Sequence, residues 1–182
     1  MKKTCLVTGG LGYIGSHICV ELIQNDWNVV ILDNLSNSSI DKLKKIKKFN
    51  STNSNITFGQ IDLTDYELFD KFVCEYIEQN KLSINMIIHL AGLKAVGESI
   101  DLPVKYYENN LVSTLNLVKI MEKYSIANLI FSSDSLEDNF SILFIRSSSI
   151  FAKFAFIVVI TLFFWANSRS RSFILERNAN RT

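Results

Sequence analysis

Residues 5–17 read Cys5-Leu6-Val7-Thr8-Gly9-Gly10-Leu11-Gly12-Tyr13-Ile14-Gly15-Ser16-His17. In this stretch an apolar run ends in a turn of glycines, and a segment with helical spacing follows. Glycine permits the positive φ of a tight turn, the close approach of a phosphate to the backbone, and close packing of a helix on a strand. The stretch therefore predicts a strand, a phosphate-binding turn and a helix whose N-terminus faces a diphosphate.

A second apolar run supports the same interpretation. Residues 29–32 read as a buried strand, and Asp33 follows them, about twenty residues after the glycines, as the dinucleotide-binding pattern requires. A carboxylate there accepts hydrogen bonds from the hydroxyl groups of an adenosine ribose and repels a 2′-phosphate, which favours NAD over NADP. A packing turn without a ligand is the alternative, and the position of Asp33 counts against it.

Strands and helices alternate along the chain as far as residue 133. The expected elements are a helix over 16–24, a polar loop over 34–39, a helix over 42–48, a strand over 56–63, a helix capped by Thr64 and Asp65, a strand over 84–90, a helix from Pro103 and a strand over 128–133. This alternation predicts an α/β fold, a Rossmann-type doubly wound parallel sheet truncated after about five strands. The ligand is expected across the carboxyl ends of the strands.

Charge and cysteine content exclude several classes of function. The net charge of +1 predicts no general attraction to nucleic acid, and the lysine-rich segment 42–48 is interpreted as a solvated helix face. Cys5, Cys19 and Cys74 lack the spacing of metal ligands, so we predict reduced thiols and no metal site. No apolar signal segment follows Met1-Lys2-Lys3, and the expected location is the cytoplasm.

The composition changes near residue 134. Every arginine lies at or beyond Arg146, whereas Lys153 is the only lysine after Lys123. Two pieces of different origin would produce such a change. Residues 1–133 are therefore interpreted as an incomplete NAD-binding Rossmann domain, and residues 134–182 as a divergent tail that is apolar and contains arginine.

Three interpretations of the tail stay open. Residues 147–168 carry a single charge, that of Lys153, and a membrane span needs about twenty largely apolar residues, so the segment is a marginal membrane anchor. The tail is alternatively a helix or strand that packs against the domain. The third interpretation is an aberrant translation after Ser133, from a shifted reading frame or a misspliced transcript, and the change from lysine to arginine favours it.

Taken together, the motifs resemble those of the UDP-glucose 4-epimerases (UDP-galactose 4-epimerases), extended short-chain dehydrogenase/reductase enzymes of galactose metabolism. The resemblance rests on residues 8–17, on residues 33–38 and above all on residues 89–99, which read His-Leu-Ala-Gly-Leu-Lys-Ala-Val-Gly-Glu-Ser. Nucleotide-sugar dehydratases share the glycines and Asp33 but usually not the last run. The resemblance extends from Met1 to about residue 133, the first half of the family's sequence.

This resemblance implies a tightly held NAD that oxidises C4 of the hexose of a UDP-sugar to a ketone and then returns hydride to the opposite face. It also implies roles for the matching residues. These are Gly9, Gly12, Tyr13, Ile14 and Gly15 at the diphosphate, Asp33 and Asn37 at the adenosine ribose with Asn34 from the same loop, Asp62 and Leu63 at the adenine, Ala91, Gly92 and Lys94 at the nicotinamide, and Asn109 and Ser132 completing the pocket. His17 and His89 are interpreted as structural.

Two departures from the family pattern concern catalysis. Asp134 stands where the family has a third serine, and an ionised carboxylate only accepts hydrogen bonds and opposes a developing alkoxide. The family's Tyr-x-x-x-Lys pair, which removes the hydroxyl proton, is absent, because no tyrosine follows Tyr124. We therefore expect no catalytic residue in this chain and no turnover by it alone.

These departures leave alternatives to the epimerase interpretation. One is a non-catalytic NAD-binding protein, tethered to a membrane or not; the other is a different nucleotide-sugar enzyme of the superfamily, which residues 92–99 disfavour. The helix from Pro103 resembles the helix through which the family forms homodimers. Because its partner helix is missing, we expect an exposed apolar stripe and poor solubility rather than a homodimer.

Overall fold

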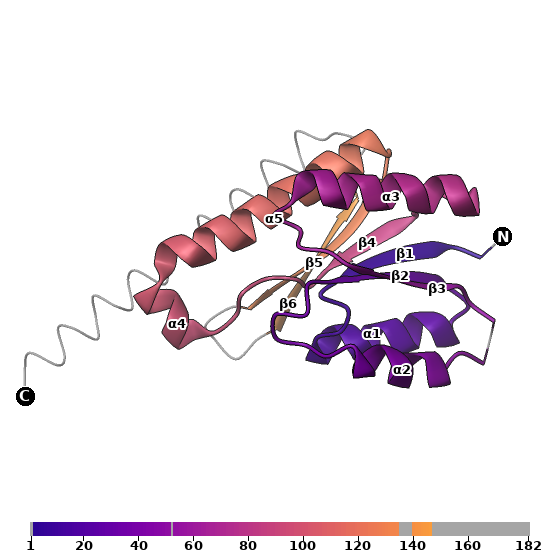
Figure 1. Cartoon of the computed structure of the whole chain (residues 1–182), viewed down its shortest axis with the longest axis horizontal. Helices are drawn as coiled ribbons and strands as arrows, with labels where there is room; N and C mark the ends of the chain where they lie inside the picture. Colours follow the sequence, from indigo (N-terminus) through magenta and orange to yellow (C-terminus); the bar gives the residue numbers. More distant parts are fainter. Residues whose placement is uncertain (1, 52, 135–139, 147–182) are drawn as a thin grey trace, which may run out of the picture.

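The computed structural model of the chain describes residues 2–51, 53–134 and 140–146 (Figure 1). Its sheet has the strand order β3-β2-β1-β4-β5-β6. The strands are β1 (Thr4–Thr8), β2 (Asn28–Asp33), β3 (Ile56–Gln60), β4 (Met86–His89), β5 (Asn128–Asp134) and β6 (Phe140–Arg146). The helices are α1 (Tyr13–Gln24), α2 (Asp41–Lys48), α3 (Tyr66–Asn80), α4 (Val96–Asp101) and α5 (Pro103–Lys123).

The first five strands are all parallel, which confirms the predicted doubly wound sheet. The chain starts in the middle of the sheet, builds outward to β3, and returns to place β4 on the other side of β1. The register sets Thr8, at the end of β1, opposite Leu32 on β2 and His89 on β4. The turns that follow these strands therefore meet at one edge of the sheet, where doubly wound folds bind their ligands.

Helices cover both faces of the sheet, with α1 and α2 on one side and α3 and α5 on the other (Figure 1). Successive side chains of a strand point to opposite faces. Leu6 of β1 accordingly packs in the layer of α3 and α5, whereas Cys5 and Val7 pack in the layer of α1 and α2. This double coverage explains why the central strands read as continuous apolar runs.

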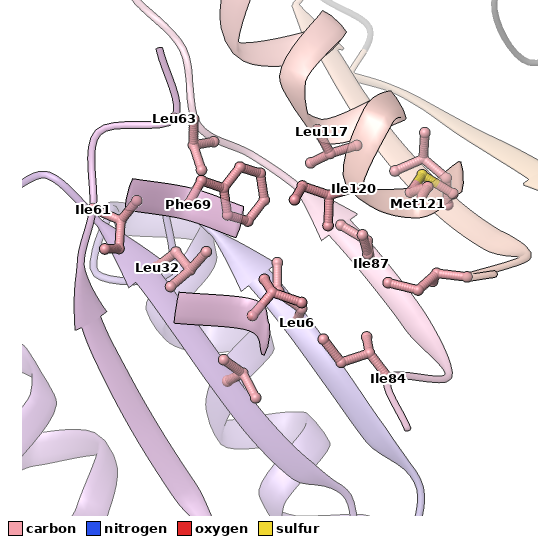
Figure 2. Close-up of a cluster of buried hydrophobic side chains, with 14 of the residues drawn as sticks. Leu6, Leu32, Ile61, Leu63, Phe69, Ile84, Ile87, Leu117, Ile120 and Met121 are labelled. Carbon is pink, nitrogen blue, oxygen red and sulfur yellow. The ribbon is translucent and has the colours of Figure 1, made fainter. Parts of the chain in front are cut away.

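The layer between the sheet and helices α3 and α5 holds large apolar side chains. Figure 2 shows Phe69 of α3 beside Leu117 and Ile120 of α5, above Leu6 and Ile87 of the sheet. All five side chains are fully buried. Burial of one such side chain contributes about 1.5–3 kcal/mol to stability, so this layer holds α5 firmly beside the carboxyl end of β4.

The expectation of an exposed stripe on α5 is wrong for most of its residues. Tyr106, Val118 and Met121, which belong to the predicted stripe, are buried. The exposed apolar side chains near this helix include Val104 and Val112 on α5 itself. The reason is that α5 uses its apolar face to cover the sheet.

The remaining differences from the sequence prediction concern the ends of two strands, one added short helix and a sixth strand. The strands expected over 56–63 and 84–90 are shorter, because the chain leaves the sheet at Ile61 and enters it after Asn85, whose side-chain Oδ1 accepts from the Thr4 backbone N–H over 2.8 Å. Helix α4 was not predicted; it is short and begins without a side-chain cap. The sheet also gains β6, which runs antiparallel to β5, so residues 140–146 of the tail form a strand.

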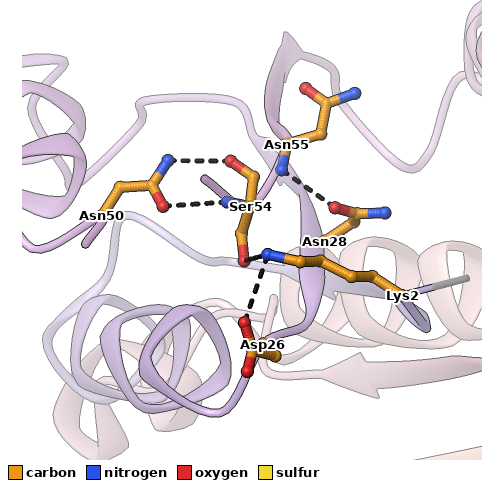
Figure 3. A network of polar contacts seen from close by, with 6 residues as sticks. All are labelled: Lys2, Asp26, Asn28, Asn50, Ser54 and Asn55. Carbon is orange, nitrogen blue, oxygen red and sulfur yellow. Dashed lines mark hydrogen bonds and ion pairs between the residues drawn. The ribbon is translucent and has the colours of Figure 1, made fainter. Parts of the chain in front are cut away.

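A polar network ties the opposite edge of the sheet together (Figure 3). Asn50 accepts from the backbone N–H of Ser54 over 3.0 Å and donates to its carbonyl oxygen over 2.8 Å. Asn28 accepts from the backbone N–H of Asn55 over 2.9 Å, and Lys2 pairs with Asp26 at 3.2 Å. Ser54 and Asn55 are thus anchored near the start of β2, away from the edge where the glycine turn lies.

Cys5 and Cys19 lie in the layer of α1 and α2. Cys5 and Cys19 are free and fully buried. Burial, with a smaller contribution from the negative charge of Asp33, raises the pKa of Cys19 to about 12, and burial likewise raises the pKa of Cys5. Both thiols therefore stay protonated and unreactive at neutral pH.

Among the helices of the described ranges, none combines the length and apolar composition that a membrane crossing needs. The predictions for residues 147–168 fall outside these ranges.

Candidate functional site

A cleft of about 450 Å³ lies at the carboxyl edge of the sheet. Its walls come from the turns that follow β1, β2, β3 and β4, and from one side of α5. The residues that line it are Gly9, Gly12, Tyr13, Ile14, Gly15, Leu32, Asp33, Asn34, Ser36, Asn37, Lys42, Ile61, Asp62, Leu63, Leu90, Ala91, Gly92, Leu93, Lys94, Asn109 and Ser113.

The glycine turn after β1 leaves no room for side chains at two positions. Gly9 has φ +65°, and a Cβ placed on it would lie 2.8 Å from the backbone nitrogen of Ala91. A Cβ on Gly15 would overlap the carbonyl oxygen of Gly9. The backbone of the glycine turn therefore packs directly against the backbone of α1 and against the backbone of the turn after β4.

The N-terminus of α1 faces the cleft. Gly12 is its N-cap residue, and Tyr13, Ile14 and Gly15 form its first turn. The first backbone N–H groups of a helix have no partner within the helix, and no acidic side chain occupies this first turn. These N–H groups and the helix dipole create a site for an anion.

Asp33, at the end of β2, is only 7% exposed and accepts three hydrogen bonds. Its Oδ2 accepts from the backbone N–H of Leu11 over 2.9 Å, which ties the acid to the glycine turn. Its Oδ1 accepts from the backbone N–H of Leu35 over 3.0 Å and from the hydroxyl of Ser38 over 2.7 Å. Each carboxylate oxygen has two lone-pair positions, so Oδ2 retains one acceptor position for a ligand.

Asp62 forms the neighbouring wall. Its Oδ1 accepts from the backbone N–H and the hydroxyl of Thr64, over 3.0 and 2.7 Å, and its Oδ2 accepts from the amide of Asn34 over 3.1 Å. Partial burial raises the pKa of Asp62, but the hydrogen bonds from Thr64 and Asn34 outweigh this effect, and the pKa lies below its ordinary value. The carboxylate is therefore charged at neutral pH.

The other end of the cleft is the turn after β4. Gly92 has φ +154°, and the next residue, Leu93, is held by the side chain of Asn110 on α5. Asn110 accepts from the Leu93 N–H over 2.8 Å and donates to the Leu93 carbonyl over 3.0 Å, while Asn109 donates to Asn110 Oδ1 over 3.0 Å. The exposed side chain of Lys94 brings a positive charge to this end of the cleft.

Both histidines have partners within the protein. His89 is 2% exposed, and both ring nitrogens lie within hydrogen-bonding distance of threonine hydroxyls, Thr8 at 2.7 Å and Thr114 at 3.3 Å. Burial, with a smaller effect of the nearby positive Lys94, lowers the pKa of His89 to about 3. His17 donates through Nδ1 to the Tyr13 carbonyl over 2.8 Å on the helix surface.

The structure brings the predicted binding residues together, with one position left open. The side chain of Ser132 falls outside the described residues, although its backbone lies in β5 opposite Ile142. The other predicted residues all line the cleft. They are Gly9, Gly12, Tyr13, Ile14, Gly15, Asp33, Asn34, Asn37, Asp62, Leu63, Ala91, Gly92, Lys94 and Asn109.

Sequence reasoning missed several lining residues. These are Leu32, Ser36, Lys42, Ile61, Leu90, Leu93 and Ser113. Ser36 lies inside the polar loop predicted over residues 34–39, between Asn34 and Asn37, so its position was available as a signal. Asn110 was also missed, because only the fold places this helical asparagine against the turn at Leu93.

The glycine turn, the open helix N-terminus and the acid at the end of β2 define a dinucleotide-binding domain of the Rossmann type. A family model described as GDP-mannose 4,6 dehydratase matches residues 6–153, and the chain belongs to this family.

Known proteins confirm the resemblance to UDP-glucose 4-epimerases. The chain is 48% identical over 130 residues to the UDP-glucose 4-epimerase of Bacillus subtilis, covering 71% of this chain and 36% of that protein. It is 46% identical over 134 residues to UDP-glucose 4-epimerase uge1 of Schizosaccharomyces pombe, covering 74% and 36%. The chain therefore spans little more than a third of the length of these relatives.

Solved structures agree with this result. The crystal structure of UDP-glucose 4-epimerase from Bifidobacterium longum, in complex with NAD+ and UDP, has a TM-score of 0.64 and 38% sequence identity to the chain, with coverage of 73% of this chain and 37% of that one. The epimerase from Stenotrophomonas maltophila, crystallised with NAD and formylated UDP-arabinopyranose, also has a TM-score of 0.64, at 29% identity.

Proposed function

We propose that this chain binds NAD in the cleft and corresponds to the NAD-binding part of a UDP-glucose 4-epimerase, an isomerase that interconverts UDP-glucose and UDP-galactose. The convergence of the predicted residues on one cleft carries this proposal. The similarity to epimerases crystallised with NAD supports it. Bound NAD would supply a hydride acceptor, and then a hydride donor, for C4 of the hexose.

The diphosphate of NAD is assigned to the N-terminus of α1. Gly12 lines the cleft there, and a Cβ on it would have a single neighbour, the Gly9 carbonyl oxygen at 3.0 Å, with open space beyond. A side chain at this position would occupy the space that the phosphates need. The N–H groups of Tyr13, Ile14 and Gly15 then bind the phosphate oxygens.

The adenosine of NAD is assigned to the end with Asp33. The free acceptor position on Asp33 Oδ2 suits a ribose hydroxyl, and Asn37 lies on the adjoining loop. Asp62 and Leu63 flank the space left for the adenine. A 2′-phosphate would bring negative charge towards Asp33, so NAD is the preferred dinucleotide.

The nicotinamide is assigned to the end with Ala91 and Gly92. Lys94 follows directly, and its charge lies where a UDP-sugar would approach the cofactor. Asn109 and, by resemblance, Ser132 complete this end of the pocket. The UDP-sugar itself is the proposed substrate of the whole enzyme, since the chain spans only about a third of its relatives.

The chain by itself is proposed to bind NAD without epimerase turnover. No tyrosine follows Tyr124, so the Tyr-x-x-x-Lys pair is absent, and the backbone of Asp134 ends β5 where the family has a serine. This absence favours a non-catalytic NAD-binding protein as the second candidate function. The two candidates share the NAD site, and they differ in whether this NAD-binding part serves an epimerase.

Calorimetry on the full chain tests the proposal. We expect NAD to bind, and the substitution Asp33→Ala to weaken its binding about tenfold or more, because a charge-assisted hydrogen bond to the ribose is lost. The same substitution should reduce the ratio of the affinity for NAD to the affinity for NADP, because the negative charge that repels the 2′-phosphate is removed. Asp101→Ala, at an exposed position outside the cleft, is the control and should leave both affinities unchanged.

Both candidates predict that the isolated chain binds NAD and does not interconvert UDP-glucose and UDP-galactose. Measurable interconversion by the isolated chain would contradict the proposed lack of turnover. Unchanged NAD binding by Asp33→Ala would refute the assignment of the adenosine end.

A further inference from the structure

A buried hydroxyl group joins β1 to the turn after β4. Thr8 is fully buried, and its Oγ1 lies 3.3 Å from the backbone nitrogens of both Leu90 and Ala91 and 2.7 Å from Nδ1 of His89. A hydroxyl offers one proton and two lone pairs. The Ala91 N–H donates to this oxygen, and the Leu90 N–H is shared between it and the Thr8 carbonyl oxygen, which lies 3.1 Å away. The hydroxyl proton of Thr8 is therefore available for a hydrogen bond to His89 Nδ1.

This arrangement fixes the protonation of His89. The Thr114 hydroxyl donates to the carbonyl oxygen of Asn110 over 2.7 Å, so its oxygen accepts from the Nε2–H of His89 over 3.3 Å. The neutral ring therefore carries its proton on Nε2, and Nδ1 accepts a hydrogen bond from the Thr8 hydroxyl. The resulting chain runs in one direction and satisfies both ring nitrogens of His89.

The chain of hydrogen bonds ends at the residue that holds the other side of the turn. The side chain of Asn110 holds Leu93 through its backbone N–H and carbonyl, over 2.8 and 3.0 Å. The turn over residues 90–93 is therefore held from β1 at its start and from α5 at its end. His89 links the two anchors through the protein interior.

We propose that Thr8, His89 and Thr114 are positioning residues for the nicotinamide half of the dinucleotide. This proposal rests on the proposed function. The three residues do not contact the cofactor. They hold the backbone of Ala91 and Gly92 at the distance from the glycine turn that the nicotinamide end of the cleft needs. The Ala91 nitrogen already lies against Gly9, so a small shift of the turn changes the width of the cleft.

The matched pair Thr8→Val and Thr8→Ser tests this role in the full chain. Valine keeps the branched shape of threonine but has no hydroxyl, whereas serine keeps the hydroxyl. We expect Thr8→Val to lower the affinity for NAD about fivefold and to leave the affinity for ADP-ribose, which lacks nicotinamide, unchanged. Thr8→Ser should show the same ratio of NAD affinity to ADP-ribose affinity as the wild-type chain. Calorimetry measures both affinities.

Amide hydrogen exchange gives a readout that needs no ligand. The Ala91 N–H should exchange about fivefold faster in Thr8→Val than in Thr8→Ser, because the substitution removes its acceptor. Thr114→Val, with Thr114→Ser as its match, tests the far end of the chain if Thr8→Val folds poorly. Like Thr8→Val, Thr114→Val should lower the affinity for NAD relative to the affinity for ADP-ribose.

The outcomes separate this proposal from the function on which it rests. Failure of the wild-type chain to bind either ligand would remove the proposed function and the positioning role together. Binding of both ligands with an equal loss in Thr8→Val, or with no loss, would overturn the positioning role alone. A loss confined to NAD, reversed by serine, supports it.

Discussion

The two ends of the cleft are held in different ways. At one end, Asp33 accepts from Leu35 and Ser38, two and five residues further along the chain, and from Leu11, 22 residues earlier. At the other end, Ala91 is held by Thr8, which precedes it by 83 residues, and Leu93 is held by Asn110, 17 residues further on. The first end combines two local loop contacts with one contact to the glycine turn, whereas the contacts named at the second end all depend on the packing of β1, β4 and α5. Disturbing the fold should therefore affect the second end more than the first.

The largest expected effect comes from Gly15→Ala. Gly15 lies in the first turn of α1 and packs against Gly9 and Gly10 of the glycine turn. The new Cβ would overlap the Gly9 carbonyl oxygen and would lie 2.8 Å from the Gly10 Cα, and backbone atoms cannot move aside as a flexible side chain would. We expect a loss of roughly 3 kcal/mol in the free energy of unfolding. Urea denaturation measures this loss.

Gly97→Ala is the matched control for that substitution. A Cβ on Gly97, in α4, would have no neighbour within 4 Å. Alanine is a better helix former than glycine, so we expect an unchanged or slightly increased stability. Equal losses in the two variants would show that steric overlap at the glycine turn is not the cause.

The same contrast explains how much the sequence predicted. The glycine turn, Asp33 and its loop follow patterns in which neighbouring residues act together, and the structure placed them as expected. The five parallel strands were also predictable, because strands covered on both faces read as apolar runs. The burial of Tyr106 and Met121 was not predicted, since a helical stripe does not reveal which surface it covers. Asn110 and Thr114 were missed as anchors because their partners lie far along the chain.

A pH titration of stability tests the second end of the cleft. His89 is neutral when folded because burial, and to a lesser extent Lys94, lowers its pKa from 6.5 to about 3. As the pH falls from 6.5 to 4.5, the unfolded chain takes up a proton at this residue and the folded chain does not. The free energy of unfolding should then decrease by up to about 1.4 kcal/mol per pH unit.

The variant His89→Asn provides the comparison for this titration. The lowered pKa of Asp62 contributes to the pH dependence mainly below this window, because an unfolded aspartate is half protonated only near pH 4. Between pH 6.5 and 4.5 the variant should therefore show a flatter profile than the wild-type chain. Identical slopes in chemical denaturation series would argue that His89 accepts a proton in the folded state.

The smallest expected effect belongs to Asp65→Ala, close to the first end of the cleft. Asp65 is the N-cap of α3, where its Oδ1 accepts from the Leu68 N–H over 3.0 Å, and its own N–H donates to the Asp62 carbonyl over 3.1 Å. Loss of the cap should cost about 1 kcal/mol of stability, whereas Asp65→Asn, which keeps an acceptor, should cost much less. If the first end is held by local contacts, NAD affinity measured by calorimetry stays within about twofold of the wild-type value in both variants. A larger loss of affinity in Asp65→Ala would mean that Asp62 depends on α3 for its position, and that this end too relies on tertiary packing.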